Sequence, residues 1–255
     1  MKHSITNRIA AALLCAATSV FVVGCGADGE ETGASGNGHP FDTLTPEQID
    51  SQARAALKSA PSMRWTGEFN SDGRQVEVDV AADEHGSCNG TFGLDSPMHI
   101  IKKGSLVHVK AEEEYWRTSF SRGMSPEQTE EMVAQFKGRW IKPPKLMSRT
   151  LGSMCDVFHT QIEDLSLASD GNPTREDDAT VDGQPVAVLT DSTTTGTTTI
   201  YVAKKGKPYP LRITVTGGDE PLDVTFTDYG KPVDTTPPPA DQILDPTTLR
   251  PEFSR

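Results

Sequence analysis

The hydrophobic residues follow two periods along the chain, and the change between them predicts the order of helices and strands. Between Ile49 and Ala60 they recur at helical spacing on one narrow face. Thr45-Pro46-Glu47-Gln48 precedes them, with the residue types of a capping box and a proline suited to the first turn. We therefore predict an amphipathic helix that starts after Thr45 and ends at Pro61.

A period of two follows and predicts strands with one buried face. Met63, Trp65, Gly67 and Phe69 alternate with polar residues, and after a turn at 71–73 the valines between 76 and 80 do the same. Short connections between such strands favour an antiparallel meander. Further strands are predicted at 87–92, 98–102, 106–110, 174–181, 184–191, 197–203, 209–216 and 222–229.

The middle of the chain returns to helical patterns. Residues 111–121 predict one helix, Ser125-Pro126-Glu127-Gln128 opens a second, and a longer one follows Pro143-Pro144 with an apolar stripe that starts at Met147. The fold class is therefore α+β, an antiparallel β-sheet packed with three or four helices.

An apolar run precedes the folded part. It extends from Ile9 to Val23, follows the basic residues Lys2 and Arg8, and ends in Val22-Val23-Gly24-Cys25. This is an export-signal pattern whose last four residues resemble the lipobox of bacterial lipoproteins, in which Cys25 would carry a thioether-linked diacylglycerol. The alternative is a transmembrane helix, but the run is shorter than the ~20 apolar residues that such a helix needs.

These patterns divide the chain into four parts and place it in the cell envelope. We expect a signal peptide at 1–24, a polar tether at 25–43 that begins with the lipidated Cys25, a folded domain at 44–234 and a proline-rich extended tail at 235–255. The lipid would hold the protein at the cell membrane on its extracytoplasmic side, since two acyl chains suffice for stable anchoring.

The charge of the chain is strongly acidic. Its net charge is −12, and loss of Lys2 and Arg8 with the signal makes it −14. Phosphate backbones would be repelled, so nucleic acid is not an expected partner. The same charge implies little attraction to an anionic membrane, so we expect the lipid to supply the attachment.

Two cysteines remain once Cys15 leaves with the signal and Cys25 is acylated. In an oxidising compartment the even pair Cys88 and Cys155 is expected to form a disulfide. A metal or redox pair is the alternative, but the C-x-x-C spacing and a nearby histidine cluster are both missing from the sequence.

Several short motifs accompany this order of elements. They are Trp65 with Gly67, Tyr115-Trp116, Gly138-Arg139-Trp140-Ile141, Val181-Asp182-Gly183-Gln184, Thr227-Asp228-Tyr229-Gly230 and Pro237-Pro238-Pro239. Over about residues 45–245 the chain resembles LolA-like actinobacterial envelope lipoproteins of the LppX/LprG type. The resemblance implies a curved antiparallel sheet that wraps helices as a half-barrel, with apolar space between them for a lipid or acyl chain.

The apolar strand residues have two interpretations. They are either ordinary core or, in part, the wall of a pocket for an acyl chain. The residues concerned are Trp65, Phe69, Val78, Phe92, Ile100 and Val107.

Motifs of catalysis and cofactor binding are missing from the sequence. Gly24 to Gly29 spells G-x-G-x-x-G, but no helix pattern follows it, and no G-x-S-x-G, S-x-x-K or H-E-x-x-H occurs. His99 and His108 could meet across neighbouring strands but lack a carboxylate for zinc. We expect no enzyme, no cofactor and no metal. The alternative to a lipid carrier is a protein-interaction or sensor module of unknown partner.

Substitution Cys25→Ser tests the anchor. We expect the variant to leave the membrane fraction after a high-salt wash, because the acylated sulfur is gone, whereas Cys15→Ser in the same apolar run remains attached. Immunoblotting of the washed fractions measures this. A Cys25→Ser protein that stays with the membrane would contradict the lipobox interpretation.

Overall fold

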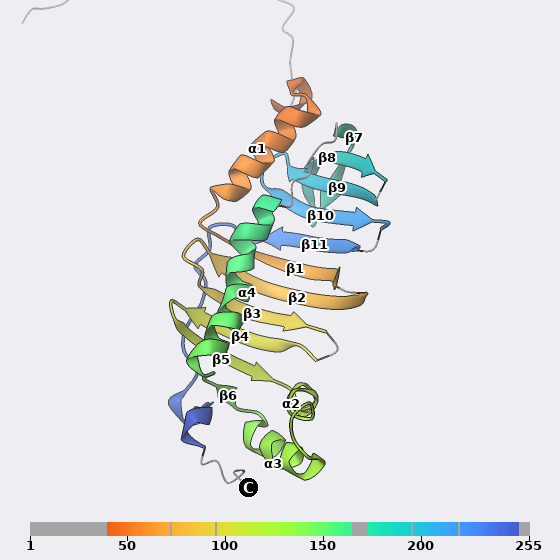
Figure 1. The fold of residues 1–255 in the computed structure, drawn as a ribbon. Helices are drawn as coiled ribbons and strands as arrows, with labels where there is room; N and C mark the ends of the chain where they lie inside the picture. The colour runs from red at the N-terminus through yellow and green to blue at the C-terminus, as the bar shows by residue number, and fades with distance from the viewer. Residues whose placement is uncertain are drawn as a thin grey trace, which may run out of the picture. The chain divides into compact units, whose positions relative to one another are not determined.

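Twelve strands form one sheet in the order β12-β6-β5-β4-β3-β2-β1-β11-β10-β9-β8-β7 (Figure 1). The computed structural model describes residues 40–249 except 72, 95, 165–172, 195 and 219. The chain from Gly38 onward forms a compact unit of its own. The strands are Ser62–Ser71 (β1), Arg74–Asp83 (β2), Cys88–Gly93 (β3), Met98–Lys103 (β4), Leu106–Ala111 (β5), Trp140–Ile141 (β6), Thr174–Val181 (β7), Gln184–Thr193 (β8), Gly196–Ala203 (β9), Pro210–Thr216 (β10), Leu222–Thr227 (β11) and Ile243–Leu244 (β12).

The described part of the chain also contains four α-helices and three short 3₁₀ helices. The predicted α+β class is thereby confirmed, with a curved and unclosed antiparallel sheet. The helices are Pro46–Lys58 (α1), Glu113–Phe120 (α2), Pro126–Phe136 (α3) and Lys145–Asp164 (α4), with 3₁₀ turns at Pro40–Thr43 (η1), Ala240–Gln242 (η2) and Pro246–Thr248 (η3).

Two meanders make up most of the sheet. Strands β1 to β5 follow one another in one half and β7 to β11 in the other, and β1 pairs antiparallel with β11 where the halves meet. Trp65 lies opposite Phe226 at this junction. Segments about 160 residues apart in sequence are therefore joined by backbone hydrogen bonds into one continuous surface.

The C-terminal tail adds a strand that the sequence does not reveal. β12 pairs parallel with β6, so that Ile243 faces Trp140 and Leu244 faces Ile141. The sequence predicts only an extended tail here, because a two-residue strand is too short to show a period of two.

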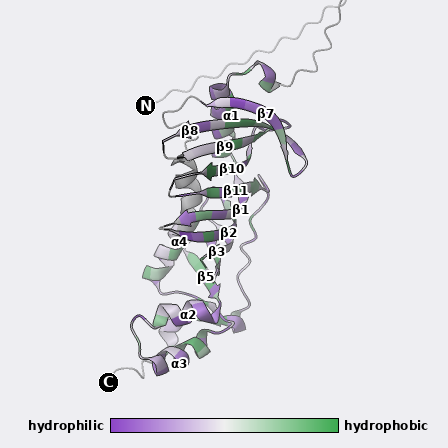
Figure 2. Cartoon of the chain, turned by 90° about the vertical axis from the view of Figure 1, so that its right-hand side faces the viewer, coloured by the Kyte–Doolittle hydropathy of each residue, from purple (hydrophilic) through white to green (hydrophobic). Residues whose placement is uncertain are grey.

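The face of the sheet that carries Trp65 is apolar along its length, and we call it the inner face. Directly paired residues of antiparallel strands point to the same side, so the register defines rows across the sheet. One such row consists of Phe226, Trp65, Val80, Gly90, Ile100, Val109 and Ile141. Figure 2 shows hydrophobic and hydrophilic stretches in the strands.

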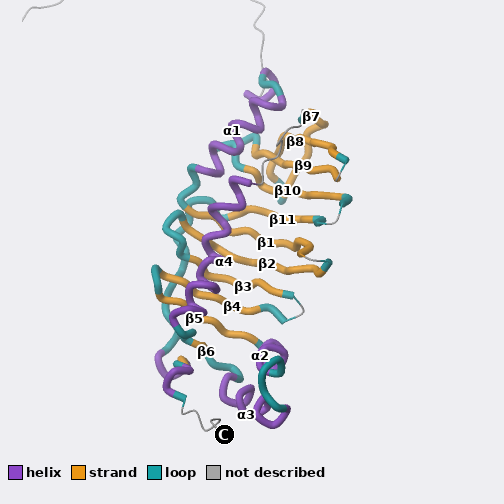
Figure 3. The backbone as a smooth tube through the Cα atoms, viewed as in Figure 1, coloured by secondary structure: helices purple, strands orange, loops and turns teal. Residues whose placement is uncertain are grey.

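Helices α1 and α4 cover part of the inner face (Figure 3). Both predicted capping boxes are present: Thr45 accepts from the Gln48 N–H at the start of α1, and Ser125 accepts from the Gln128 N–H at the start of α3. Ile49 of α1 is fully buried against the sheet core.

A disulfide attaches α4 to the sheet. Cys88 at the start of β3 and Cys155 in α4 are both fully buried, with their Cα atoms 5.7 Å apart, and they form the predicted bond. The long helix is thus held covalently on the inner face in addition to its apolar contacts.

Gly67 lets β1 and β11 approach closely. Its φ is +146°, and a Cβ atom added there would lie 2.0 Å from the backbone oxygen of Asp223. Only glycine accommodates both the backbone conformation and the contact.

The edge strand β7 is irregular. Its register with β8 shifts between Glu176 and Ala179, and Asp178 in the shifted segment forms ion pairs with Arg175 and Lys204. Beyond the shift, Ala179 and Val181 pack against a second, smaller hydrophobic cluster on the opposite face of the sheet, which we call the outer face. Val186 is fully buried in this cluster.

The disulfide is testable by removing it. The double substitution Cys88→Ala/Cys155→Ala opens a loop of 67 residues, and we expect a loss of about 4 kcal/mol in the free energy of unfolding. Urea denaturation measures the loss. Reductant should shift the parent curve and leave that of the double variant in place, and titration of two free thiols per unreduced chain beginning at residue 26 would refute the bond.

The constraint at Gly67 predicts a second stability effect. Gly67→Ala should lower the free energy of unfolding by about 1–3 kcal/mol, since the strands must move apart. Gly123→Ala is the matched control, because its added methyl group meets nothing within 4 Å. Equal unfolding midpoints for the two variants would contradict the account of Gly67.

Candidate ligand-binding site

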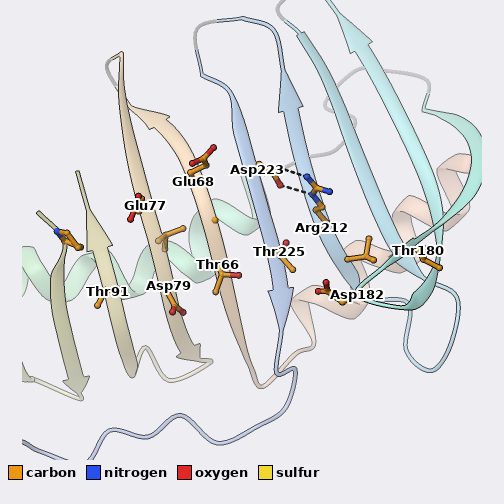
Figure 4. A pocket seen from close by; sticks show the side chains of 14 residues that line it. Thr66, Glu68, Glu77, Asp79, Thr91, Thr180, Asp182, Arg212, Asp223 and Thr225 are labelled. Atoms are coloured by element: carbon orange, nitrogen blue, oxygen red, sulfur yellow. Dashed lines mark hydrogen bonds and ion pairs between the residues drawn. The ribbon is translucent and has the colours of Figure 1, made fainter. Parts of the chain in front are cut away.

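The outer face of the sheet carries a polar depression of about 610 Å³ (Figure 4). Arg212 lies at its wall and pairs with Asp223 through both arms of the guanidinium, at 2.8 Å from Nε and 2.6 Å from Nη2. This hydrogen bonding raises the pKa of Arg212 above its usual value, so the guanidinium stays charged. Figure 4 also shows Thr66, Thr91 and Thr225 on neighbouring strands.

The depression has the character of a hydrated surface. A second exposed pair, Arg64 with Asp79, is bonded in the same bidentate way at 2.7 Å from Nε and from Nη2. Exposed ion pairs of this kind contribute little to stability. Their charges are paired with each other and are therefore not available to a ligand. The apolar inner face is therefore the better candidate for a ligand site.

The two strand histidines are held in place by their surroundings. The His99 ring has Nε2 2.7 Å from Asn89 Oδ1 and its centroid 4.9 Å from that of Trp140. Burial lowers the pKa of both His99 and His108, helped by Lys110 and Lys142 respectively. Both rings are therefore mostly neutral near pH 7. In the described part of the chain, no group of three or more metal-binding side chains is brought together.

An apolar groove of about 530 Å³ lies where the inner face meets α2 and α4. Its volume falls within the range of about 300–1,000 Å³ that is usual for small-molecule sites. The polar residues that line it are Arg74, Ser96, Glu114, Thr118, Ser119 and Arg122. The apolar residues that line it are Val76, Phe92, Leu94, Met98, Tyr115 and Leu151.

The groove continues along the sheet as a half-buried apolar row. Phe69 lies directly opposite Val76, Leu222 opposite Phe69, and Val215 opposite Leu222, all four side chains being partly exposed. The Trp65 ring stacks on that of Phe69, with centroids 6.4 Å apart. We call Phe69, Val76, Leu222 and Val215 the open row.

The arrangement of the helices explains why this row is open. Figures 1 and 3 show α1 and α4 crossing the strands near one end, while the opposite ends of β10, β11, β1 and β2 extend beyond them. The inner face is therefore covered and closed on one side and accessible on the other.

The six strand residues that the sequence singles out fall into two groups, those near the groove and those buried in the core. Phe92 lines the groove, and Phe69 and Trp65 lie along its continuation. Val78, Ile100 and Val107 are core residues, exposed by only 5%, 1% and 2%. Contact of a ligand with any of the six stays a prediction, as does acylation of Cys25, which lies outside the described residues.

The sequence does not single out the helix side of the groove. Tyr115 and Leu151 are partly buried apolar residues on helical patterns. Such patterns show that a residue faces inward, but the strand it meets depends on how α2 and α4 cross the sheet. None of the described helices is long and apolar enough to cross a membrane.

Comparisons with known proteins give a likeness of fold. No protein-family model matches the chain, and neither does any curated protein. Among solved structures, LprF from Mycobacterium bovis is 13% identical with a TM-score of 0.49, covering 76% of this chain and 96% of that one. The Mycobacterium tuberculosis lipoprotein LppX is 15% identical with a TM-score of 0.47, covering 73% and 96%.

A third similar structure belongs to the LolA superfamily. NE2245 from Nitrosomonas europaea is 13% identical with a TM-score of 0.24, covering 72% of this chain and 92% of that one. LprF, LppX and NE2245 are of the types named by the sequence resemblance, and at such identities the likeness concerns the fold.

Proposed function

We propose that the protein is a lipid-anchored envelope protein that binds a lipid or another apolar ligand without covalent chemistry. The observation that carries the proposal is the apolar groove between the inner face, α2 and α4, with its continuation into the open row. Acyl chains would lie against the apolar side chains of this space, and the lining residues Arg74 and Arg122 would face the headgroup.

The physical reason is the uncovered apolar surface. Each methylene group moved from water into an apolar site contributes about 0.8 kcal/mol. Phe69 and Phe92 are half-buried, so an acyl chain laid over them would remove apolar surface of both partners from water.

The N-terminal sequence supports the proposed location at the outer side of the membrane. The signal pattern and the lipobox ending at Cys25 direct the chain to the outer side of the membrane, and residues 26–39 are rich in Gly and otherwise mostly polar. A tether of that composition would let the domain reach lipid in the membrane to which it is anchored.

A protein-interaction module is the second candidate function. The observation that favours it is the openness of the row, since Phe69, Leu222 and Val215 are accessible along an edge rather than enclosed in a cavity. An apolar segment of a partner protein could cover such a row as well as a lipid could.

Mass spectrometry of an organic extract separates the two functions. A chain that begins at residue 26, exported through a cleavable signal, should carry one lipid per protein. Phe92→Asp places a carboxylate in the groove and should lower bound lipid at least tenfold, which corresponds to about 1.4 kcal/mol.

The matched control is Thr91→Asp on the opposite face of the same strand, which should keep the lipid. Thermal unfolding verifies that both variants fold. An empty extract, together with no uptake of added phospholipid or glycolipid, would reject the carrier function and favour the interaction module.

A further inference from the structure

Exposed large apolar side chains gather at one end of α4. Four such residues occur in the described part of the chain: Leu106, Met124, Leu146 and Met147, exposed by 39%, 37%, 79% and 54%. Leu146 and Met147 lie in the first turn of α4, and Leu106 follows the β4–β5 turn. The sequence places Met147 on the buried stripe of this helix, but the stripe reaches the sheet only further along, at the half-buried Leu151.

Basic residues surround the same place. A groove of about 650 Å³ between the β4–β5 turn and the start of α4 contains Leu106 in its wall, and none of the described residues that line it is a carboxylate. Lys142 lies 3.5 Å from Asp245, while Lys145 and Arg149 have no carboxylate partner in the described part of the chain. The basic residues of the groove are Lys102, Lys142, Lys145 and Arg149.

Tight packing builds one wall of this groove. A Cβ atom on Gly152 would lie 3.4 Å from Lys102 Cε and 3.5 Å from Val107 Cγ2. The aliphatic stem of Lys102 therefore lies close to α4 and covers apolar surface there.

We propose that this surface docks on an anionic phospholipid membrane. It consists of Leu106 and Leu146 together with the four basic residues, and we call it the basic–apolar patch. The two apolar side chains would enter the boundary between headgroups and acyl chains, and Lys145 and Arg149 would face the lipid phosphates.

Charge complementarity favours a membrane over other occupants. The chain has a net charge of −12, so a groove whose described lining contains four basic residues and no carboxylate differs from the average charge of the chain. A soluble anion would be satisfied by the cations alone, whereas the exposed Leu146 gains only from an apolar phase beside the anionic one. The whole-chain charge predicts little electrostatic attraction to a membrane because it averages over this patch.

The patch adds to the proposed function a place of membrane contact. It relies on the extracytoplasmic location but not on the apolar groove, which is lined by other residues. Variants of the two sites can therefore be tested separately.

Co-sedimentation with lipid vesicles tests the charges. The chain beginning at residue 26 should bind phosphatidylcholine vesicles that contain phosphatidylglycerol, bind pure phosphatidylcholine vesicles far less, and lose binding in about 1 M salt, where the Debye length is about 3 Å. Lys145→Glu/Arg149→Glu should weaken binding at least tenfold, on the order of what two cations near the surface supply.

Lys205→Glu/Lys207→Glu on the β9–β10 turn is the matched control, with the same change of net charge and exposed positions. It should change binding less than twofold. Equal losses in the two double variants, or equal binding to both kinds of vesicle, would overturn the proposal.

A fluorescent side chain tests the apolar contact. Leu146→Trp should show a blue shift and quenching by a lipid-phase quencher when anionic vesicles are added, while Met124→Trp outside the patch should show neither. Binding to soluble polyglutamate with no shift of Leu146→Trp on vesicles would overturn the proposal and indicate an acidic protein partner.

The groove variant Phe92→Asp separates this proposal from the previous one. It should keep vesicle binding although it has lost the bound lipid. If Phe92→Asp abolished vesicle binding while Lys145→Glu/Arg149→Glu kept it, the membrane contact would belong to the apolar groove and the patch would play no part.

Discussion

The arrangement of the domain depends on one constraint: its helices can cover only part of the apolar inner face of the sheet. Rows of apolar side chains cross the inner side of the sheet from β11 to β6, and α1 and α4 lie across only part of this side. The disulfide from Cys88 to Cys155 holds α4 against β3. What the helices leave uncovered becomes the groove and the open row, so the hydrophobic effect that forms the core also favours the proposed binding surface.

The three surfaces of the domain suit three surroundings. The outer face carries exposed ion pairs, such as that of Arg212 with Asp223, and is in contact with water. The inner face is apolar and suits a chain of methylene groups. The end of α4 combines Leu146 with Lys145 and Arg149, a mixture suited to the boundary between water and lipid. A protein that handles lipid near a membrane needs all three, and here they lie on different elements.

Local patterns predicted much of this fold, and long-range contacts account for what they missed. Thr45 and Ser125 cap their helices because a capping box involves residues only three positions apart. The disulfide followed from the compartment and an even number of cysteines. The parallel pairing of β12, the exposure of Met147 and the lining of the groove by Tyr115 and Leu151 depend on where distant elements cross, which no periodicity encodes. Alternation placed all six candidate pocket residues on the inner face, but it could not separate the half-buried Phe92 from the buried Ile100.

The irregular strand β7 has a consequence for the solubility of the protein. An unclosed sheet ends in two strands whose backbone groups could recruit further strands from other molecules. Here one edge, β12, is only two residues long, and the other bends at its register shift, where Asp178 is engaged by Arg175 and Lys204. Neither edge offers the flat, regular backbone on which fibrils grow, so the sheet can stay open for a ligand without becoming a template for aggregation.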